Sequence, residues 1–168
     1  LKQVDAPFAP VANPSNRVIQ WRLLFPAIWH SLGLPKTLFL AMPHIGCLLA
    51  LAMIAHVAYG ATGNRLLTLG TAALLGASSW FFVSTGWLTY FDSWLVLGLL
   101  TVVFAKPQLA LAVACLLCPW VDERFIIALP LCLMIRFIYF RRMKDKDYKS
   151  MLQDGLLAVC AVTLYAIS

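Results

Sequence analysis

The chain has 168 residues, of which 62% are hydrophobic and only 12% are charged, and its mean hydropathy is +0.84. Because a soluble domain carries about 25% charged residues, this composition is that of an integral membrane protein. The formal charge of +6 does not indicate nucleic acid binding, since the basic residues lie between hydrophobic runs and form no face of their own.

The first 36 residues are predicted to lie outside the membrane, as one domain. Residues 1–16 are rich in Pro, Ala and Asn, which is typical of an extended loop. Residues 17–33 alternate apolar and polar side chains, which predicts short amphipathic helices lying on the membrane, with Trp21 and Trp29 at the level of the headgroups. We therefore expect an interfacial N-terminal segment.

Residues 37–168 are predicted to form the second domain, an all-α polytopic transmembrane helix bundle of about five spans and a truncated last helix. The predicted elements are 37–59, 66–83, 88–105, 109–121, 125–140 and 155–168. The last helix is only about 21 Å long at 1.5 Å per residue, whereas the bilayer core is about 30 Å thick. We expect the chain to be a fragment, completed by further transmembrane helices of the same chain or of a partner.

The basic residues predict an orientation in the cell membrane. If the hydrophilic loop at 141–153 is cytoplasmic, the turns at 60–65 and 106–108 are cytoplasmic too, and basic residues gather on that side. Arg136, one turn inside the helix, is expected to snorkel the same way. Residues 1–36 and 122–124 then lie on the outer face.

Two acidic residues of different helices are predicted to lie at a similar depth. The elements 88–105 and 109–121 meet at 106–108 and must form an antiparallel hairpin. Asp92 precedes Lys106 by fourteen positions and Asp122 follows Gln108 by fourteen, so each rises about 21 Å from the turn. Charges at such depth are costly, and they usually face the interior of a bundle or a wet cavity.

The acidic residues at this depth, with a nearby arginine and histidine, form a polar patch of candidate functional residues. The carboxylates of Asp92, Asp122 and Glu123 are suited to act as a general base, to hold a divalent metal or to carry protons. Arg124 is suited to phosphate binding, and His44 is a possible accessory base or ligand. The structural alternative is that the segment 122–124 caps a helix and that Asp92 caps another.

The cysteines are predicted to be structural. All five lie within apolar runs, and the C-x-x-C formed by Cys115 and Cys118 has a Leu-Leu spacer and no second ligand pair. This pattern favours buried packing over redox or metal chemistry.

The segment NRVIQWRLLFPAIWHSLGLP resembles polytopic membrane proteins of the glycosyltransferase-C type, in which an outer loop with a catalytic acid precedes an Arg-Leu-x-x-Pro element on the membrane. Residues 22–26 match that element, and Asp5 is the only acid in the preceding loop. The segment WVDERFIIALP is similar to bacterial multi-pass proteins. The loop before this element, residues 1–16, contains no Asp-x-Asp metal motif. The resemblance implies a lipid-phosphate-linked sugar as donor and a divalent metal as cofactor.

Three functions fit these features. The first is an enzyme that transfers sugar from a polyprenyl-phosphate donor at the outer face, with Asp5 or Asp122 as base or metal ligand and Arg22 or Arg124 as phosphate partner. The second is a transporter or channel module with Asp92 and Asp122 along a polar path. The third is a non-catalytic assembly subunit. It is favoured by a stripe of small residues on one helix face, formed by Ala72, Ala73, Gly76 and Ala77.

Overall fold

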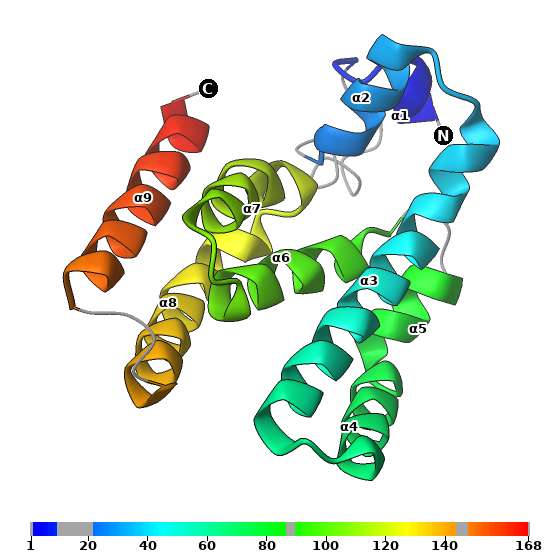
Figure 1. The fold of residues 1–168 in the computed structure, drawn as a ribbon. Helices are drawn as coiled ribbons and strands as arrows, with labels where there is room; N and C mark the ends of the chain where they lie inside the picture. The colour runs from blue at the N-terminus through cyan, green and yellow to red at the C-terminus, as the bar shows by residue number, and fades with distance from the viewer. Residues whose placement is uncertain (1, 10–21, 87–89, 144–147, 168) are drawn as a thin grey trace. The chain divides into compact units, whose positions relative to one another are not determined.

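The computed structural model describes residues 2–9, 22–86, 90–143 and 148–167, and every regular element in these ranges is an α-helix (Figure 1). The chain packs as two compact units: the first is Leu1–Leu97 with Trp120–Glu123, and the second is Gly98–Pro119 with Arg124–Ser168. The helices are α1 (Lys2–Asp5), α2 (Leu24–Leu32), α3 (Lys36–Thr62), α4 (Arg65–Gly76), α5 (Ser79–Gly86), α6 (Asp92–Phe104), α7 (Gln108–Val121), α8 (Arg124–Met143) and α9 (Tyr148–Ile167).

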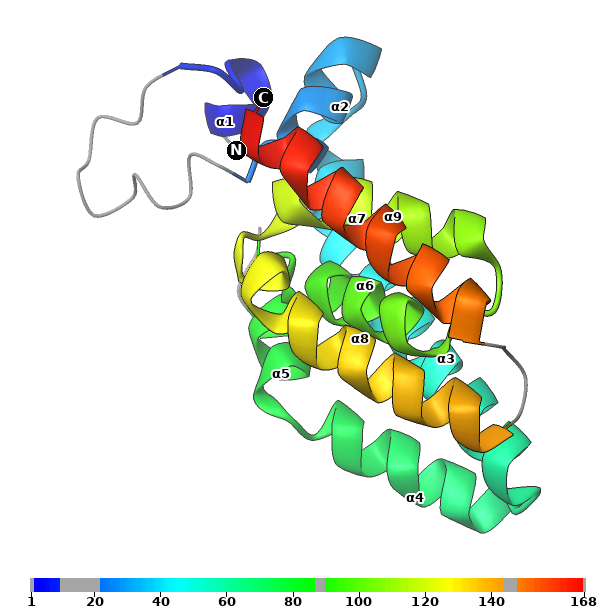
Figure 2. The same ribbon diagram turned by 90° about the vertical axis from the view of Figure 1, so that its left-hand side faces the viewer.

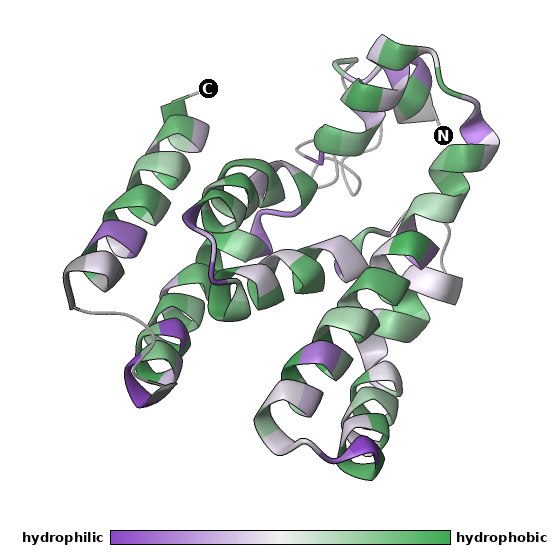
Figure 3. Cartoon of the chain, viewed as in Figure 1, coloured by the Kyte–Doolittle hydropathy of each residue, from purple (hydrophilic) through white to green (hydrophobic). Residues whose placement is uncertain are grey.

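The all-helical class is confirmed, but the prediction of about five membrane spans is wrong. Among the described helices only α3 is long and apolar enough to cross a membrane, by length and composition. Its 27 residues extend about 40 Å at 1.5 Å per residue. Hydrophobic residues dominate α3 in Figure 3, with a hydrophilic residue at its start and a few along its length. Helix α3 is therefore the one candidate membrane span among the single helices that the structure describes.

The predicted span at 66–83 is broken into two helices. Asn64 caps the start of α4, where its side chain accepts hydrogen bonds from the backbone N–H groups of Leu66 and Leu67. At the other end the Ser78 hydroxyl donates a hydrogen bond to the Leu75 carbonyl, a local bond that competes with helix continuation. Helix α5 then leaves at 60° to α4 (Figure 2), so the two pass the span test only if taken together.

The later helices are short or interrupted by charge. Helices α6 and α7 have 13 and 14 residues, about 20 Å each at 1.5 Å per residue. Helix α8 has 20 residues, but it carries four arginines: Arg124, Arg136, Arg141 and Arg142. In α9 the apolar part begins only at Leu152. The error was therefore to count short or charge-interrupted apolar helices as membrane spans.

An aromatic core organises the first unit. The buried side chains of Phe25, Trp29, Phe39 and Phe91 pack as ring pairs, with centroids 4.5 Å apart for Phe25–Phe91 and 5.3 Å for Phe39–Phe91. Helices α4 and α5 both pack along α3. Phe39 lies near the start of α3, and Phe91 follows α5. Because these two rings are in contact, α4 and α5 lead the chain back to the N-terminal end of α3.

Close helix contact in the first unit depends on Gly46. A Cβ atom there would lie 2.5 Å from the Ser93 hydroxyl and 2.8 Å from the Trp94 indole. The absence of a side chain allows two hydrogen bonds from α6 to α3, from Ser93 Oγ to the Pro43 carbonyl (2.9 Å) and from Trp94 Nε1 to the Met42 carbonyl (2.8 Å). The start of α6 is thus fixed to α3.

The second unit contains the rest of α6 and α7 together with α8 and α9. Gly98 packs directly against Cys118 and Phe125, where an added Cβ would overlap the sulfur atom. Helices α8 and α9 contact each other. The predicted boundary between an outer domain at 1–36 and a bundle at 37–168 stays a prediction, and residues 10–21 of the predicted interfacial segment lie outside the described ranges.

Candidate functional site

Two residues that the sequence selected separately, Arg22 and Asp122, form an ion pair in the first unit. Arg22 lies just before α2, and Asp122 follows the last residue of α7. Arg22 Nη2 is 2.9 Å from Asp122 Oδ2, the Asp122 side chain is 2% exposed and that of Arg22 is 17% exposed. Because a buried carboxylate is costly without a partner, Arg22 compensates the charge of Asp122.

The aromatic core positions both members of this pair. Phe25 follows Arg22 by less than one helical turn and stacks on Phe91. Val121 precedes Asp122 and is buried in the same core. Residues far apart in the sequence are therefore held at the same place by apolar packing, and the ion pair follows from that packing.

Glu123 completes the cluster on its solvent side. Its side chain is 37% exposed, and Glu123 Oε2 lies 3.9 Å from Arg22 Nε. Neither of these two atoms has a hydrogen-bond partner. A donor N–H and an acceptor carboxylate oxygen are therefore buried 3.9 Å apart, too far for a direct hydrogen bond, and neither is satisfied.

The other candidates lie at different places. Asp5 is exposed, and its carboxylate pairs with Lys36 Nζ at 2.7 Å. Asp92 opens α6 and is half-buried, and His44 is exposed on α3. Arg124 is exposed at the start of α8, in the second unit. The predicted proximity of Asp92 and Asp122 stays a prediction.

The donor set does not fit the divalent metal that the resemblance implies. Within the described ranges no three side chains of His, Cys, Asp or Glu come together. Asp122, the most buried of the candidate acids, is directed at a guanidinium group. We therefore derive no step through a metal.

The C-x-x-C cysteines are buried free thiols, as the sequence predicted. Burial raises the pKa of Cys115 to about 11, although the nearby Arg136 cation offsets part of this rise. Burial also raises the pKa of Cys118 to about 12. Because a thiolate is the nucleophile and the metal ligand, thiols with such pKa values are inert near neutral pH.

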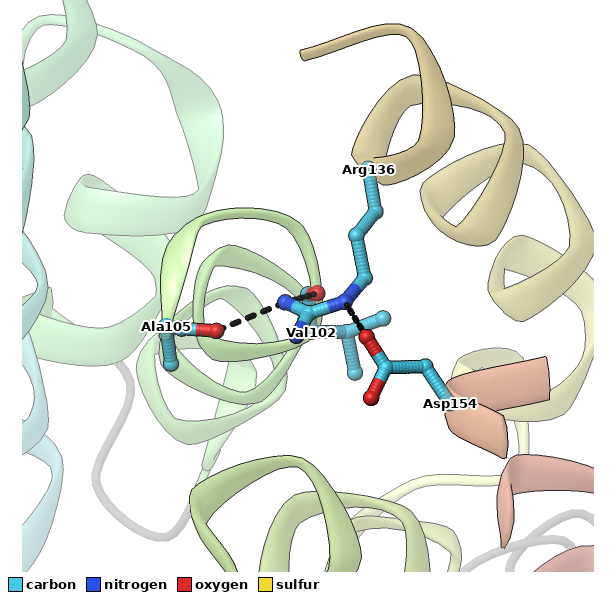
Figure 4. A network of polar contacts seen from close by, with 4 residues as sticks. All are labelled: Val102, Ala105, Arg136 and Asp154. Atoms are coloured by element: carbon cyan, nitrogen blue, oxygen red, sulfur yellow. Dashed lines mark hydrogen bonds and ion pairs between the residues drawn. The ribbon is translucent and has the colours of Figure 1, made fainter. Parts of the chain in front are cut away.

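A second polar cluster, which sequence reasoning missed, lies in the second unit (Figure 4). Arg136 does not snorkel to the surface but is 2% exposed. Its Nε donates to Asp154 Oδ2 at 3.0 Å, and its Nη1 donates to the carbonyls of Val102 (2.8 Å) and Ala105 (2.7 Å). The sequence pattern that could have predicted this pair is an acidic residue, Asp154, near the start of one apolar helix and an arginine, Arg136, within another.

Comparison of the chain with known protein families, with characterised proteins and with solved structures finds no match. The Arg22–Asp122–Glu123 cluster brings one guanidinium group and two carboxylates together among the described residues.

Proposed function

We propose that this chain is a membrane-associated protein that binds a lipid-phosphate-linked sugar at the Arg22–Asp122–Glu123 cluster and transfers the sugar there. The supporting observation is that Arg22 Nε and Glu123 Oε2, two buried polar atoms 3.9 Å apart beside a buried carboxylate, have no hydrogen-bond partners. A phosphate oxygen and a sugar hydroxyl are groups of the kind that such a donor and acceptor bind.

Each residue of the cluster has a distinct role in this proposal. Asp122 is buried and paired, so it orients Arg22 and does not act as a base. Arg22 donates through Nε to a phosphate oxygen of the donor and stabilises the charge that develops there. Glu123 accepts the proton of the acceptor hydroxyl while the oxygen of that hydroxyl forms a bond to the anomeric carbon. The bond from that carbon to the phosphate oxygen breaks, and the lipid phosphate leaves with the electron pair.

The proposed location of the site is the outer face of the membrane. Arg22 pairs with Asp122, and Phe91 contacts Phe39 near the start of α3. Both contacts support placing residues 1–36 and 122–124 on the same side of the membrane. With α3 as the span, the turn at 60–65 then lies on the opposite side of the membrane. Single cysteines introduced at Asp5 and Gly60, in a chain without Cys160, should differ in labelling by an impermeant maleimide added to intact cells. Equal labelling would contradict this orientation.

The test of function is sugar transfer from a labelled polyprenyl-phosphate donor by membranes that contain the chain. Glu123→Gln removes the base but keeps the size of the side chain, and we expect at least a hundredfold loss of transfer. Arg65→Gln removes an exposed charge at the start of α4, and transfer should stay at the level of the original chain. Full activity of Glu123→Gln would reject the site.

The same membranes test the two alternative functions. A transporter or channel module would move ions or sugars across proteoliposomes without transferring label. An assembly subunit would do neither. The stripe that motivated the third alternative lies partly within the molecule, because a Cβ on Gly76 would meet Leu51 of α3 at 3.5 Å.

A further inference from the structure

One donor group of Arg136 is left without a partner in the second unit. The Nε and Nη1 atoms of this guanidinium are occupied by Asp154 and by two backbone carbonyls. The Nη2 atom is buried and has no hydrogen-bond partner, although a buried donor of this kind usually has one. An unfilled donor on a side chain that is 2% exposed indicates a place for an acceptor.

A pocket lies beside this guanidinium group. Its volume is about 110 Å³. A single water molecule requires only about 10–15 Å³ on this scale, so the pocket has room for a larger group. The pocket is lined by Leu133, Arg136, Phe137, Asp154 and Gly155. Arg136 and Asp154 are its buried polar part, and the other three residues are half-buried and apolar.

The charges of the pocket select the kind of ligand. Arg136 is already paired with Asp154, so a second anion would meet a carboxylate and would not be favoured. A guanidinium nitrogen only donates hydrogen bonds, so the ligand must provide an acceptor oxygen. The side chains of Leu133 and Phe137 offer contact to hydrocarbon. These conditions describe an uncharged carbonyl group attached to an apolar body.

We propose that this pocket binds the uncharged carbonyl oxygen of an acyl compound, with the oxygen at Arg136 Nη2 and the hydrocarbon against Leu133 and Phe137. Two sources share this chemistry, the ester of a membrane lipid and a small dissolved amide. The proposal concerns the second unit and is independent of sugar transfer in the first.

The test uses the whole chain in a detergent without carbonyl groups, titrated with diacylglycerol that carries ¹³C in its ester carbonyls or with ¹³C-labelled N-methylacetamide. A carbonyl that accepts a hydrogen bond from guanidinium should show a downfield ¹³C shift that saturates. Gly155→Leu should abolish that shift, because the glycine lines the pocket and the larger side chain would occupy it. A Cβ atom added at Gly155 meets no atom within 4 Å, so the backbone there tolerates a side chain.

Gly70→Leu is the matched control, since this helical glycine of α4 also has open space around it. It should bind like the original chain. Saturation with diacylglycerol alone assigns a lipid ester, and saturation with the amide assigns a small dissolved ligand. Absence of saturation with both probes, or equal shifts in Gly155→Leu and the original chain, would overturn the proposal.

Discussion

Arg136 carries a positive charge that is almost completely buried. Because its ion pair with Asp154 is buried, removing one partner leaves an uncompensated charge. We expect Asp154→Leu to lower the free energy of unfolding by about 3–5 kcal/mol. The double variant Arg136→Met/Asp154→Leu should lose clearly less than the sum of the two single variants, as measured by denaturant unfolding in detergent. Additive losses would show that the two side chains do not interact.

The sequence identified Arg22, Asp122 and Glu123 one by one, but not their association. Charge within apolar surroundings is visible in a sequence, so each residue could be selected. The register of ideal helices matched Asp122 with Asp92, whereas the structure pairs it with Arg22. This pairing depends on the packing of Phe25, Phe91 and Val121, which links distant segments and has no local signal.

At the scale of elements, the contact between α3 and α6 depends on the missing side chain of Gly46. Gly46→Ala would force the Ser93 hydroxyl and the Trp94 indole away, and overpacking of this kind costs about 1–3 kcal/mol. We expect a lower midpoint of thermal unfolding. Gly70→Ala, in open space on α4, should instead be neutral or stabilise by up to about 1 kcal/mol. A Gly46→Ala chain as stable as Gly70→Ala would contradict the described contact.

The positions of the helices followed well from the sequence, but the number of membrane spans did not. Apolar runs placed α3, α6, α7 and α8 within a few residues of their observed bounds. At the break between α4 and α5 the Ser78 hydroxyl bonds to the Leu75 carbonyl, a local interaction that hydropathy does not detect. The count of five spans was wrong mainly because apolar runs too short to cross a membrane were counted as spans.

At the scale of the whole molecule, membrane association is assigned to α3. Leu48 lies within this helix and is 69% exposed, so an arginine there would face the hydrocarbon. Leu48→Arg should weaken insertion by about 2.5–3.5 kcal/mol. The measurement is the fraction of chain that resists alkaline carbonate extraction. Thr62→Arg, at the end of the same helix, is the control and should extract like the original chain. An unchanged membrane fraction for Leu48→Arg would argue against α3 as the span.

The proposed function requires that Arg22 Nε bind the phosphate of the lipid while Arg22 Nη2 stays paired with Asp122. Arg22→Lys tests this directly, because lysine keeps the charge opposite Asp122 but lacks the second donor of the guanidinium group. The measurement is the affinity for a polyprenyl-phosphate sugar in lipid nanodiscs, followed by ³¹P resonance. We predict saturable binding that weakens at least tenfold in Arg22→Lys and is unaltered in Arg65→Lys. Equal affinity of the Arg22→Lys and original chains would contradict the claim.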